Sequence, residues 1–357
     1  MMFNPRLGIT IGDPSGVGPE TIVKAWQSPQ VHAACRPFVI GSSDVLRRAV
    51  DLLGAEFTVV TVDAVTQIND DPTTLPCLEI ESKTAAQAPP ARCDPRGGQA
   101  AYEAVVLAAR LAQTQQIDGI VTAPLNKAAL QAAGHQYPGH TELLADCCEA
   151  ENTAMMLYLE KETEDHSGSS EAWGVVHTTL HMAMRDIFKH LSTKRIVRCA
   201  ALADWAIRTL KTLPENQSPR IGVCALNPHA GEDGLFGDEE QQIIAPAVAA
   251  ALREGLNVSG PFPADSLVAQ ADRGAFDVLV AMYHDQGHIP LKLLGMHRAV
   301  NITLGLPIVR TSASHGTAFD RAWQGIADAD GMIAAIRLAA KLTRHRDCSS
   351  VGASEGG

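Results

Sequence analysis

The sequence lacks the features that mark a membrane, secreted or nucleic-acid-binding protein. No apolar run reaches the roughly 18 residues that a membrane-spanning helix needs, and the first residues show no signal peptide. The eight cysteines form no Cys-x-x-Cys pair, so we interpret them as thiols of a reducing cytoplasm. A net charge of −11 disfavours nucleic acid as the main partner, although a local basic pocket could hold a small anion. We therefore expect a cytoplasmic, globular protein.

Short apolar strands alternate with helical stretches along the 357 residues. This alternation predicts an α/β protein with a largely parallel sheet. A polar stretch at 160–174 is expected to be an inserted loop. Representative strands are expected at 7–12, 38–41, 117–124 and 278–282, and representative helices at 97–115 and 330–345.

Histidines follow three separate predicted strands, where open α/β sheets bind their ligands. They are His181, His229 and His284. Neutral imidazole is a common ligand of zinc and other divalent metals, and three protein ligands leave a position open for substrate. His177 and His288 are rival ligands, and each histidine alone could equally be a hydrogen-bonded structural residue. The residues alone do not decide between a metal site and structural histidines.

Anion recognition is predicted in several other loops. Arg310 follows a strand, and its fork suits a carboxylate or phosphate. In PGHTELLA, Thr141 either caps a helix or binds an anion together with His140. The glycine-rich GDPSGVGPE (12–20) is not a Gly-x-Gly-x-x-Gly fingerprint, so a tight turn and a ligand contact are equally open there. SHGTA (314–318) is a second loop of small residues.

Eight segments in order resemble the 4-hydroxythreonine-4-phosphate dehydrogenase family of vitamin B6 (pyridoxine) synthesis. They are GDPSGVGPE, VTAPLNK, YPGHTE, LNPHAGE, PADS, AMYHDQG, VNITLGLPIVRTS and HGTAFD. The resemblance implies a two-domain isocitrate/isopropylmalate dehydrogenase-like αβα fold with the active site in the interdomain cleft. It places a cofactor-side domain at 1–130 plus 300–357. A metal, substrate and dimerisation domain is expected at 131–299.

The same resemblance implies a metal-dependent, NAD(P)-linked oxidation of 4-hydroxythreonine 4-phosphate. The product would be a β-keto acid that decarboxylates to 3-amino-2-oxopropyl phosphate. One zinc, magnesium or cobalt ion would be held by His181, His229 and His284, in a homodimer with a shared active site. The implied substrate-binding residues are His140, Thr141, Lys292, Asn301 and Arg310.

The implied cofactor contacts are Asp13, Gly316 and Thr317. We favour NAD over NADP, because no basic cluster for a 2′-phosphate follows that loop apart from Arg321. Asp265 and Lys292 are the candidates for proton transfer.

Other functions remain open at this point. Paralogues of the family oxidise 4-phosphorylated threonate or erythronate, or an aromatic cis-dihydrodiol such as that of terephthalate. A metal-dependent hydrolase could also use three histidines and an anion pocket. RAWQG (321–325) and the insertion at 160–174 depart from the family pattern and bear on fine specificity.

Overall fold

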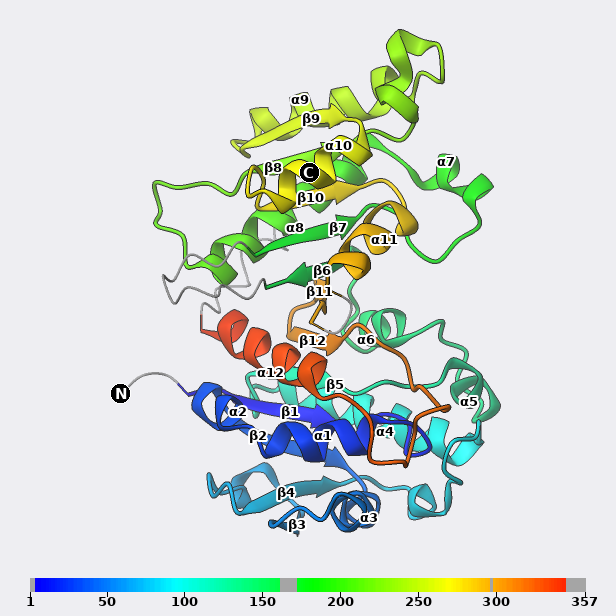
Figure 1. Ribbon diagram of the computed structural model, residues 1–357, viewed down its shortest axis with the longest axis vertical. Coiled ribbons are helices and arrows are strands. Elements are labelled where there is room, and N and C mark those ends of the chain that lie inside the picture. Colours follow the sequence, from blue (N-terminus) through cyan, green and yellow to red (C-terminus); the bar gives the residue numbers. More distant parts are fainter. Residues whose placement is uncertain (1–3, 161–171, 296–297, 345–357) are drawn as a thin grey trace. The chain divides into compact units, whose positions relative to one another are not determined.

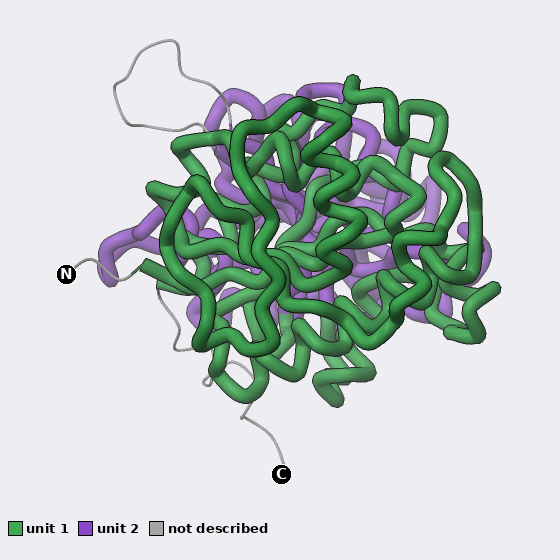
Figure 2. The backbone as a smooth tube through the Cα atoms, turned by 90° about the horizontal axis from the view of Figure 1, so that it is seen from below, with its two compact units in different colours: residues 1–153, 305–357 green, residues 154–304 purple. Residues whose placement is uncertain are grey.

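The computed structural model divides into two compact units, residues 1–153 with 305–357 (unit 1) and residues 154–304 (unit 2) (Figure 2). It describes residues 4–160, 172–295 and 298–344, so most of the expected insertion at 160–174 lies outside the described residues. Within the described part, no helix is long and apolar enough to cross a bilayer. Figure 1 shows that each unit combines a sheet with helices.

Unit 1 is built on six parallel strands in the order β3-β4-β2-β1-β5-β12. The interior strands are mostly apolar and are buried except at their end residues, as expected where helices cover both faces of a parallel sheet. The predicted α/β architecture is thereby confirmed. The strands are β1 (Arg6–Thr10), β2 (Arg36–Gly41), β3 (Thr58–Val62), β4 (Thr74–Glu79), β5 (Gly119–Thr122) and β12 (Val309–Ala313).

The helices of unit 1 pack on its central strands. Helices α12 and α4 both contact β1 and β5, while α1 packs against α12 and α3, and α5 and α6 pack against α4 (Figure 1). The helices are α1 (Gly18–Trp26), α2 (Pro29–Ala34), α3 (Ser43–Leu53), α4 (Pro95–Gln113), α5 (Lys127–Ala132), α6 (His140–Cys147) and α12 (Asp330–Thr343). Because α5 and α6 pack on α4, the division between the units falls at 153/154, whereas the sequence analysis placed a domain boundary at 130/131.

Unit 2 has the strand order β11-β6-β7-β10-β8-β9. Strand β6 runs antiparallel to both of its neighbours and the other pairs are parallel. The strands are β6 (Ala154–Leu159), β7 (Trp173–His177), β8 (Ile221–Cys224), β9 (Val258–Phe262), β10 (Val278–Ala281) and β11 (Val300–Leu304). The helices are α7 (Ile187–His190), α8 (Thr193–Lys211), α9 (Ala245–Arg253), α10 (Ala264–Asp272) and α11 (His284–Gly295).

An ion network anchors the amino-terminal edge of the sheet in unit 2. The Asp277 carboxylate, which is 10% exposed, accepts hydrogen bonds from Lys211 Nζ at 2.6 Å and from Arg220 Nε and Nη2, both at 3.0 Å. It also accepts from the Arg220 backbone N–H at 2.8 Å. Burial alone would raise the pKa of Asp277, but these bonds outweigh it and lower the pKa to about 2.

Replacing Asp277 by Asn should lower the free energy of unfolding by about 2 kcal/mol at pH 7. This value follows because the pKa of Asp277 in the folded protein is nearly two units below that in the unfolded chain. A depressed carboxylate pKa stabilises the fold above the unfolded-state pKa near 4, and this stabilisation is lost as the pH falls toward 2. Urea unfolding at pH 7, 5, 4 and 3 should therefore show the gap between wild type and D277N narrowing only below pH 4. The prediction would be contradicted if the difference between wild type and D277N did not change with pH. It would also be contradicted if D51N, the control at an exposed site, lost as much unfolding free energy as D277N.

Candidate functional site

Arg310 is a deeply buried charged residue of the expected set. It lies on β12 with 2% of its surface exposed, and its Nε and Nη2 donate to Thr122 Oγ1 at the end of β5, at 3.2 and 2.6 Å. Burial lowers the pKa of Arg310 to about 9, and the Glu142 carboxylate opposes that shift. The guanidinium is therefore charged at neutral pH and lies at the carboxyl end of β5. The sequence analysis expected Arg310 to follow a strand, which is wrong, because Arg310 is the second residue of β12.

His140 and Thr141 form the first turn of α6. Gly139 is the N-cap, so the expectation that Thr141 caps this helix is wrong: Thr141 lies inside the helix, buried. Burial, with the nearby charge of Arg310, lowers the pKa of His140 well below its usual value. The His140 Nε2 atom is buried with no hydrogen-bond partner in the described structure. Buried polar atoms are nearly always paired, so this atom indicates a missing ligand or water.

The two glycine-containing loops expected near a cofactor lie side by side in unit 1. The Val17 N–H donates to the Thr317 carbonyl at 3.0 Å, and a Cβ on Gly16 would lie 2.9 Å from Thr317 Cβ. Gly316 has open space around it. Asp13 is fully buried, its Oδ1 accepts from the Ser15 N–H at 2.9 Å, and its Oδ2 has no partner among the described residues. Burial raises the pKa of Asp13 to about 6.

Trp323, noted in the sequence only as a departure, fixes the segment that follows SHGTA. Its Nε1 donates to the Pro14 carbonyl at 2.9 Å, and the Arg48 guanidinium stacks 3.8 Å above its ring. The buried Glu20 carboxylate accepts from the backbone N–H groups of Trp323 and Gly325. RAWQG therefore ties the second small-residue loop to GDPSGVGPE. Arg321 is exposed.

In unit 2, the structure brings His181 and His284 together. Their ring centroids lie 5.6 Å apart, close to the separation of about 5 Å that two imidazoles have on one tetrahedral ion with nitrogens at about 2.0–2.1 Å. His284 is the first residue of α11, and its Nδ1 lies 2.6 Å from Asp285 Oδ1. Because a carboxylate accepts, Nδ1 carries the hydrogen and Nε2 keeps its lone pair. A carboxylate on the far nitrogen is the usual support of a metal-binding histidine.

His229 is not brought to this pair. It opens a left-handed turn in which five successive residues, 229–233, have φ between 42° and 81°. Its ring lies 6.3 Å from that of Phe236. Accordingly, no group of three His, Cys, Asp or Glu side chains among the described residues is arranged to hold a metal ion. Two of the three expected donors fit a shared cation by their chemistry and separation, and the third stands apart on its loop.

Glu240, which the sequence analysis missed, anchors the loop that carries His229. It begins a π-helical segment (Glu240–Ile244), and its Oε1 accepts from the backbone N–H groups of Leu226 and Asn227, both at 2.8 Å. Its Oε2 accepts from Asn227 Nδ2 at 2.9 Å. Burial would raise the pKa of Glu240, but these bonds outweigh it and hold the pKa below its usual value.

The remaining expected residues of unit 2 lie on three elements. Asn301 is on β11, and its Oδ1 is buried with no partner within the described ranges. Lys292 is half-buried on α11, two turns after His284. Asp265 is exposed in the first turn of α10, where its Oδ1 accepts from the Ser266 N–H at 2.7 Å. The orphan oxygen of Asn301 is thus the strongest sign of a ligand among these three.

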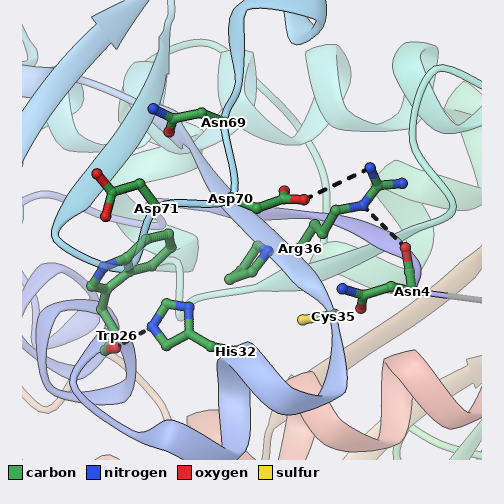
Figure 3. Close-up of a pocket in the computed structure, with 9 residues that line it drawn as sticks. Asn4, Trp26, His32, Cys35, Arg36, Asn69, Asp70 and Asp71 are labelled. Atoms are coloured by element: carbon green, nitrogen blue, oxygen red, sulfur yellow. Dashed lines mark hydrogen bonds and ion pairs between the residues drawn. The ribbon is translucent and has the colours of Figure 1, made fainter.

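A hollow in unit 1 lies away from these residues, near the amino ends of β1 and β2 (Figure 3). Its polar groups are paired with one another: Trp26 Nε1 donates to the Pro72 carbonyl at 3.0 Å, His32 Nε2 lies 2.6 Å from the Trp26 carbonyl, and Arg36 Nε donates to the Asn4 carbonyl at 3.1 Å. This pairing is what a structural role requires, so we do not assign function to the hollow.

Comparison with known proteins decides the family. Residues 33–339 match the family model described as pyridoxal phosphate biosynthetic protein PdxA. The chain belongs to this family. It is 43% identical to a 4-hydroxythreonine-4-phosphate dehydrogenase of Geobacter metallireducens, covering 95% of this chain and 96% of the relative. It is 42% identical to a D-threonate 4-phosphate dehydrogenase of Salmonella typhimurium, covering 96% and 100%.

Solved structures agree with this membership. A 4-hydroxythreonine-4-phosphate dehydrogenase from Klebsiella pneumoniae matches with a TM-score of 0.81 and 40% identity, over 95% of this chain and all of that one. A terephthalate 1,2-cis-dihydrodiol dehydrogenase from Burkholderia xenovorans matches with a TM-score of 0.63 and 29% identity, over 95% and 98%. This PdxA-family chain is thus an oxidoreductase of the dehydrogenase type, as the sequence resemblance predicts.

Replacing Glu240 by Gln should loosen the His229 loop, because one carboxylate oxygen becomes an NH2 group that faces a donor. Losing hydrogen bonds to a charged group costs about 1.5–3 kcal/mol. Hydrogen–deuterium exchange should then speed up at the amides of Leu226 and Asn227. The matched control E254Q, at the exposed end of α9, should leave exchange there unchanged, and equal protection in E240Q would show that Glu240 does not hold the loop.

Proposed function

We propose that this PdxA-family dehydrogenase oxidises 4-hydroxythreonine 4-phosphate with a nicotinamide cofactor. The observation that carries the proposal is the buried, charged guanidinium of Arg310 beside the unpartnered Nε2 of His140. A buried cation favours a bound anion beside it, and arginine suits both phosphate and carboxylate. The oxidised product is a β-keto acid, which loses CO2 to give 3-amino-2-oxopropyl phosphate.

D-Threonate 4-phosphate, or the related erythronate, is the second candidate substrate. Relatives named for it match this chain as well as those named for 4-hydroxythreonine 4-phosphate, at 42% and 43% identity. Both substrates carry a 4-phosphate, so Arg310 and His140 serve either. An aromatic dihydrodiol has less support, since the relative named for it is 29% identical. A hydrolase is disfavoured because the matched relatives are dehydrogenases.

Different residues of the chain bind the substrate, bind the cofactor and transfer the proton. In unit 1 the substrate anion is bound by Arg310, His140 and Thr141. In unit 2 polar groups of the substrate are bound by Lys292 and Asn301. The loops at Asp13 and at Gly316–Thr317 receive the nicotinamide cofactor, because Gly316 leaves open space and the loops are tied together. We favour NAD, since Arg321 is the one basic residue next to that loop in the sequence. Lys292 or Asp265 accepts the hydroxyl proton.

His181 and His284, joined by His229, would hold one divalent cation such as zinc, magnesium or cobalt. When bound, this ion lowers the pKa of the substrate hydroxyl as a Lewis acid. The Nδ1–H of His284, bonded to Asp285, keeps the opposite nitrogen available. The support for this assignment is the separation of the first two rings.

We also propose a homodimer with a shared active site. The support is that unit 2 exposes several large apolar side chains, which a subunit interface could cover. They are Met184, Phe188, Leu235, Phe236, Ile289 and Leu293, with exposures from 48% to 82%. The cytoplasmic location stays a prediction from the sequence.

The activity test is a substrate panel followed by reduced-nicotinamide absorbance. 4-Hydroxythreonine 4-phosphate, D-threonate 4-phosphate and D-erythronate 4-phosphate are supplied with NAD+ or NADP+. A chelator should abolish turnover, and added divalent metal should restore it. Turnover of one phosphorylated substrate supports the proposal and selects among the three. Turnover confined to an unphosphorylated diol, or unaffected by chelator, would contradict it.

The matched variant for this test is Arg310→Lys, which keeps the charge but loses the fork. Because bidentate contacts to the substrate anion are lost, kcat/KM should fall by about 10- to 100-fold, the equivalent of roughly 1.4–2.7 kcal/mol. Arg337→Lys, on the half-exposed side of α12, serves as the control and should change little. Unchanged kinetics in R310K would remove Arg310 from the substrate site.

A further inference from the structure

Two buried histidines of unit 2 have no part in the proposed reaction. His177 is the last residue of β7 and has no exposed surface, and His288 follows His284 by one turn of α11 and is 8% exposed. Both were weighed as rival metal ligands. Their contacts point to a different use.

Two contacts of these rings indicate where their hydrogens lie. His177 Nδ1 is 3.2 Å from the Met155 carbonyl, and His177 Nε2 is 3.0 Å from His288 Nδ1. A carbonyl only accepts, so His177 Nδ1 donates, and the Nε2 of a neutral ring must then accept. His288 therefore donates through Nδ1. Burial supports the neutral forms, because it lowers the pKa of His177 to about 4 and that of His288 to about 2.

The hydrogen-bonded pair contacts the expected metal ligand His284 through stacked rings. The His288 ring stacks on that of His284, with centroids 3.7 Å apart and planes 14° from parallel. An ion bound to a histidine lies in the plane of its ring, so two nearly parallel stacked rings cannot both ligate one ion. His288 is thus placed to hold the plane of His284, and it is not placed to be a further ligand of the same ion.

Gly287 makes this arrangement possible. A Cβ at this position would lie 2.5 Å from His177 Nε2 and 2.6 Å from Val175 Cγ1. Any side chain there would occupy the space in which His177 meets His288. The close approach of β7 and α11, and with it the bond between the two histidines, depends on the missing side chain.

We propose that His177 and His288 form a positioning pair that holds the His284 imidazole in the orientation needed to share a cation with His181. The chain runs from the Met155 carbonyl through His177 to His288, whose ring lies flat on His284. This inference rests on the metal site of the proposed function. What it adds is the hydrogen-bonded pair of His177 and His288 and the effect of this pair on the orientation of the ligand His284.

The first test measures Co2+ affinity of the full-length protein by calorimetric titration, without substrate or cofactor. His288→Leu removes the stacked ring and should weaken Co2+ binding by about 10- to 100-fold, as is typical when the support of a metal ligand is lost. His177→Phe removes the acceptor for His288, together with the bond to the Met155 carbonyl, and should weaken binding in the same direction. The control is His135→Leu, which deletes a similarly stacked histidine on Tyr102 in unit 1 and should bind Co2+ as wild type does.

The second test determines which ring nitrogen of each histidine carries the hydrogen. It uses long-range proton–nitrogen NMR of metal-free protein labelled with 15N-histidine. His177 and His288 should both carry hydrogen on Nδ1 and none on Nε2. A hydrogen on Nε2 of either ring would overturn the proposal, and so would wild-type Co2+ affinity in both H288L and H177F. If H288L does not fold, H177F decides.

The two tests separate this inference from the proposed function. A wild-type protein that binds no Co2+ would defeat the metal site, and the NMR spectrum alone would then decide whether the pair exists. A wild type that binds Co2+ while both variants bind equally well would leave the metal site standing and defeat the positioning role.

Discussion

The buried charge of Arg310 is the constraint on which the site in unit 1 depends. Removing a guanidinium from water costs several kcal/mol unless opposite charge or hydrogen bonds compensate. Thr122 accepts two of its bonds, and the Glu142 carboxylate supplies nearby negative charge. Burial nevertheless lowers the pKa of Arg310 to about 9, so further negative charge beside the guanidinium would stabilise it. An anionic substrate would supply this charge, which explains why a chain with a net charge of −11 can bind a doubly anionic ligand.

Two histidines of unit 2, His177 and His288, differ from Arg310, because burial lowers their pKa values and keeps their rings neutral. His177 and His288 are buried without a carboxylate, and His284 bonds one through Nδ1, so each ring has a defined donor side and a defined acceptor side. Neutral ligands leave the full charge of a cation available to a substrate oxygen. The left-handed turn at 229–233, which stands apart from these rings, stores backbone strain, and Glu240 anchors the residues just before it.

Much of this organisation can be predicted from the sequence, because it follows from local pattern. The alternation of strands and helices predicts the α/β fold, and the strand ends predict that His181 and His284 follow strands, whereas Arg310, expected after a strand, lies within β12. The depth of Arg310 could not be predicted, since it depends on Thr122 from a strand far away in the sequence. The turn at His229 could not be predicted either, because Ala230 and Glu232 have no preference for positive φ. The role of Glu240 could not be predicted, because it depends on hydrogen bonds to Leu226 and Asn227, which the fold brings close from more than ten residues away.

The central claim is that Arg310 receives the anionic group of a small phosphorylated acid. A crystal structure with 4-hydroxythreonine 4-phosphate or D-threonate 4-phosphate bound tests it most directly. We predict a phosphate or carboxylate of the ligand within hydrogen-bonding distance of the Arg310 guanidinium, with the His140 imidazole also bonded to the ligand. A well-ordered ligand bound elsewhere, with none of its atoms near the Arg310 guanidinium and His140 Nε2 still without a partner, would contradict the account.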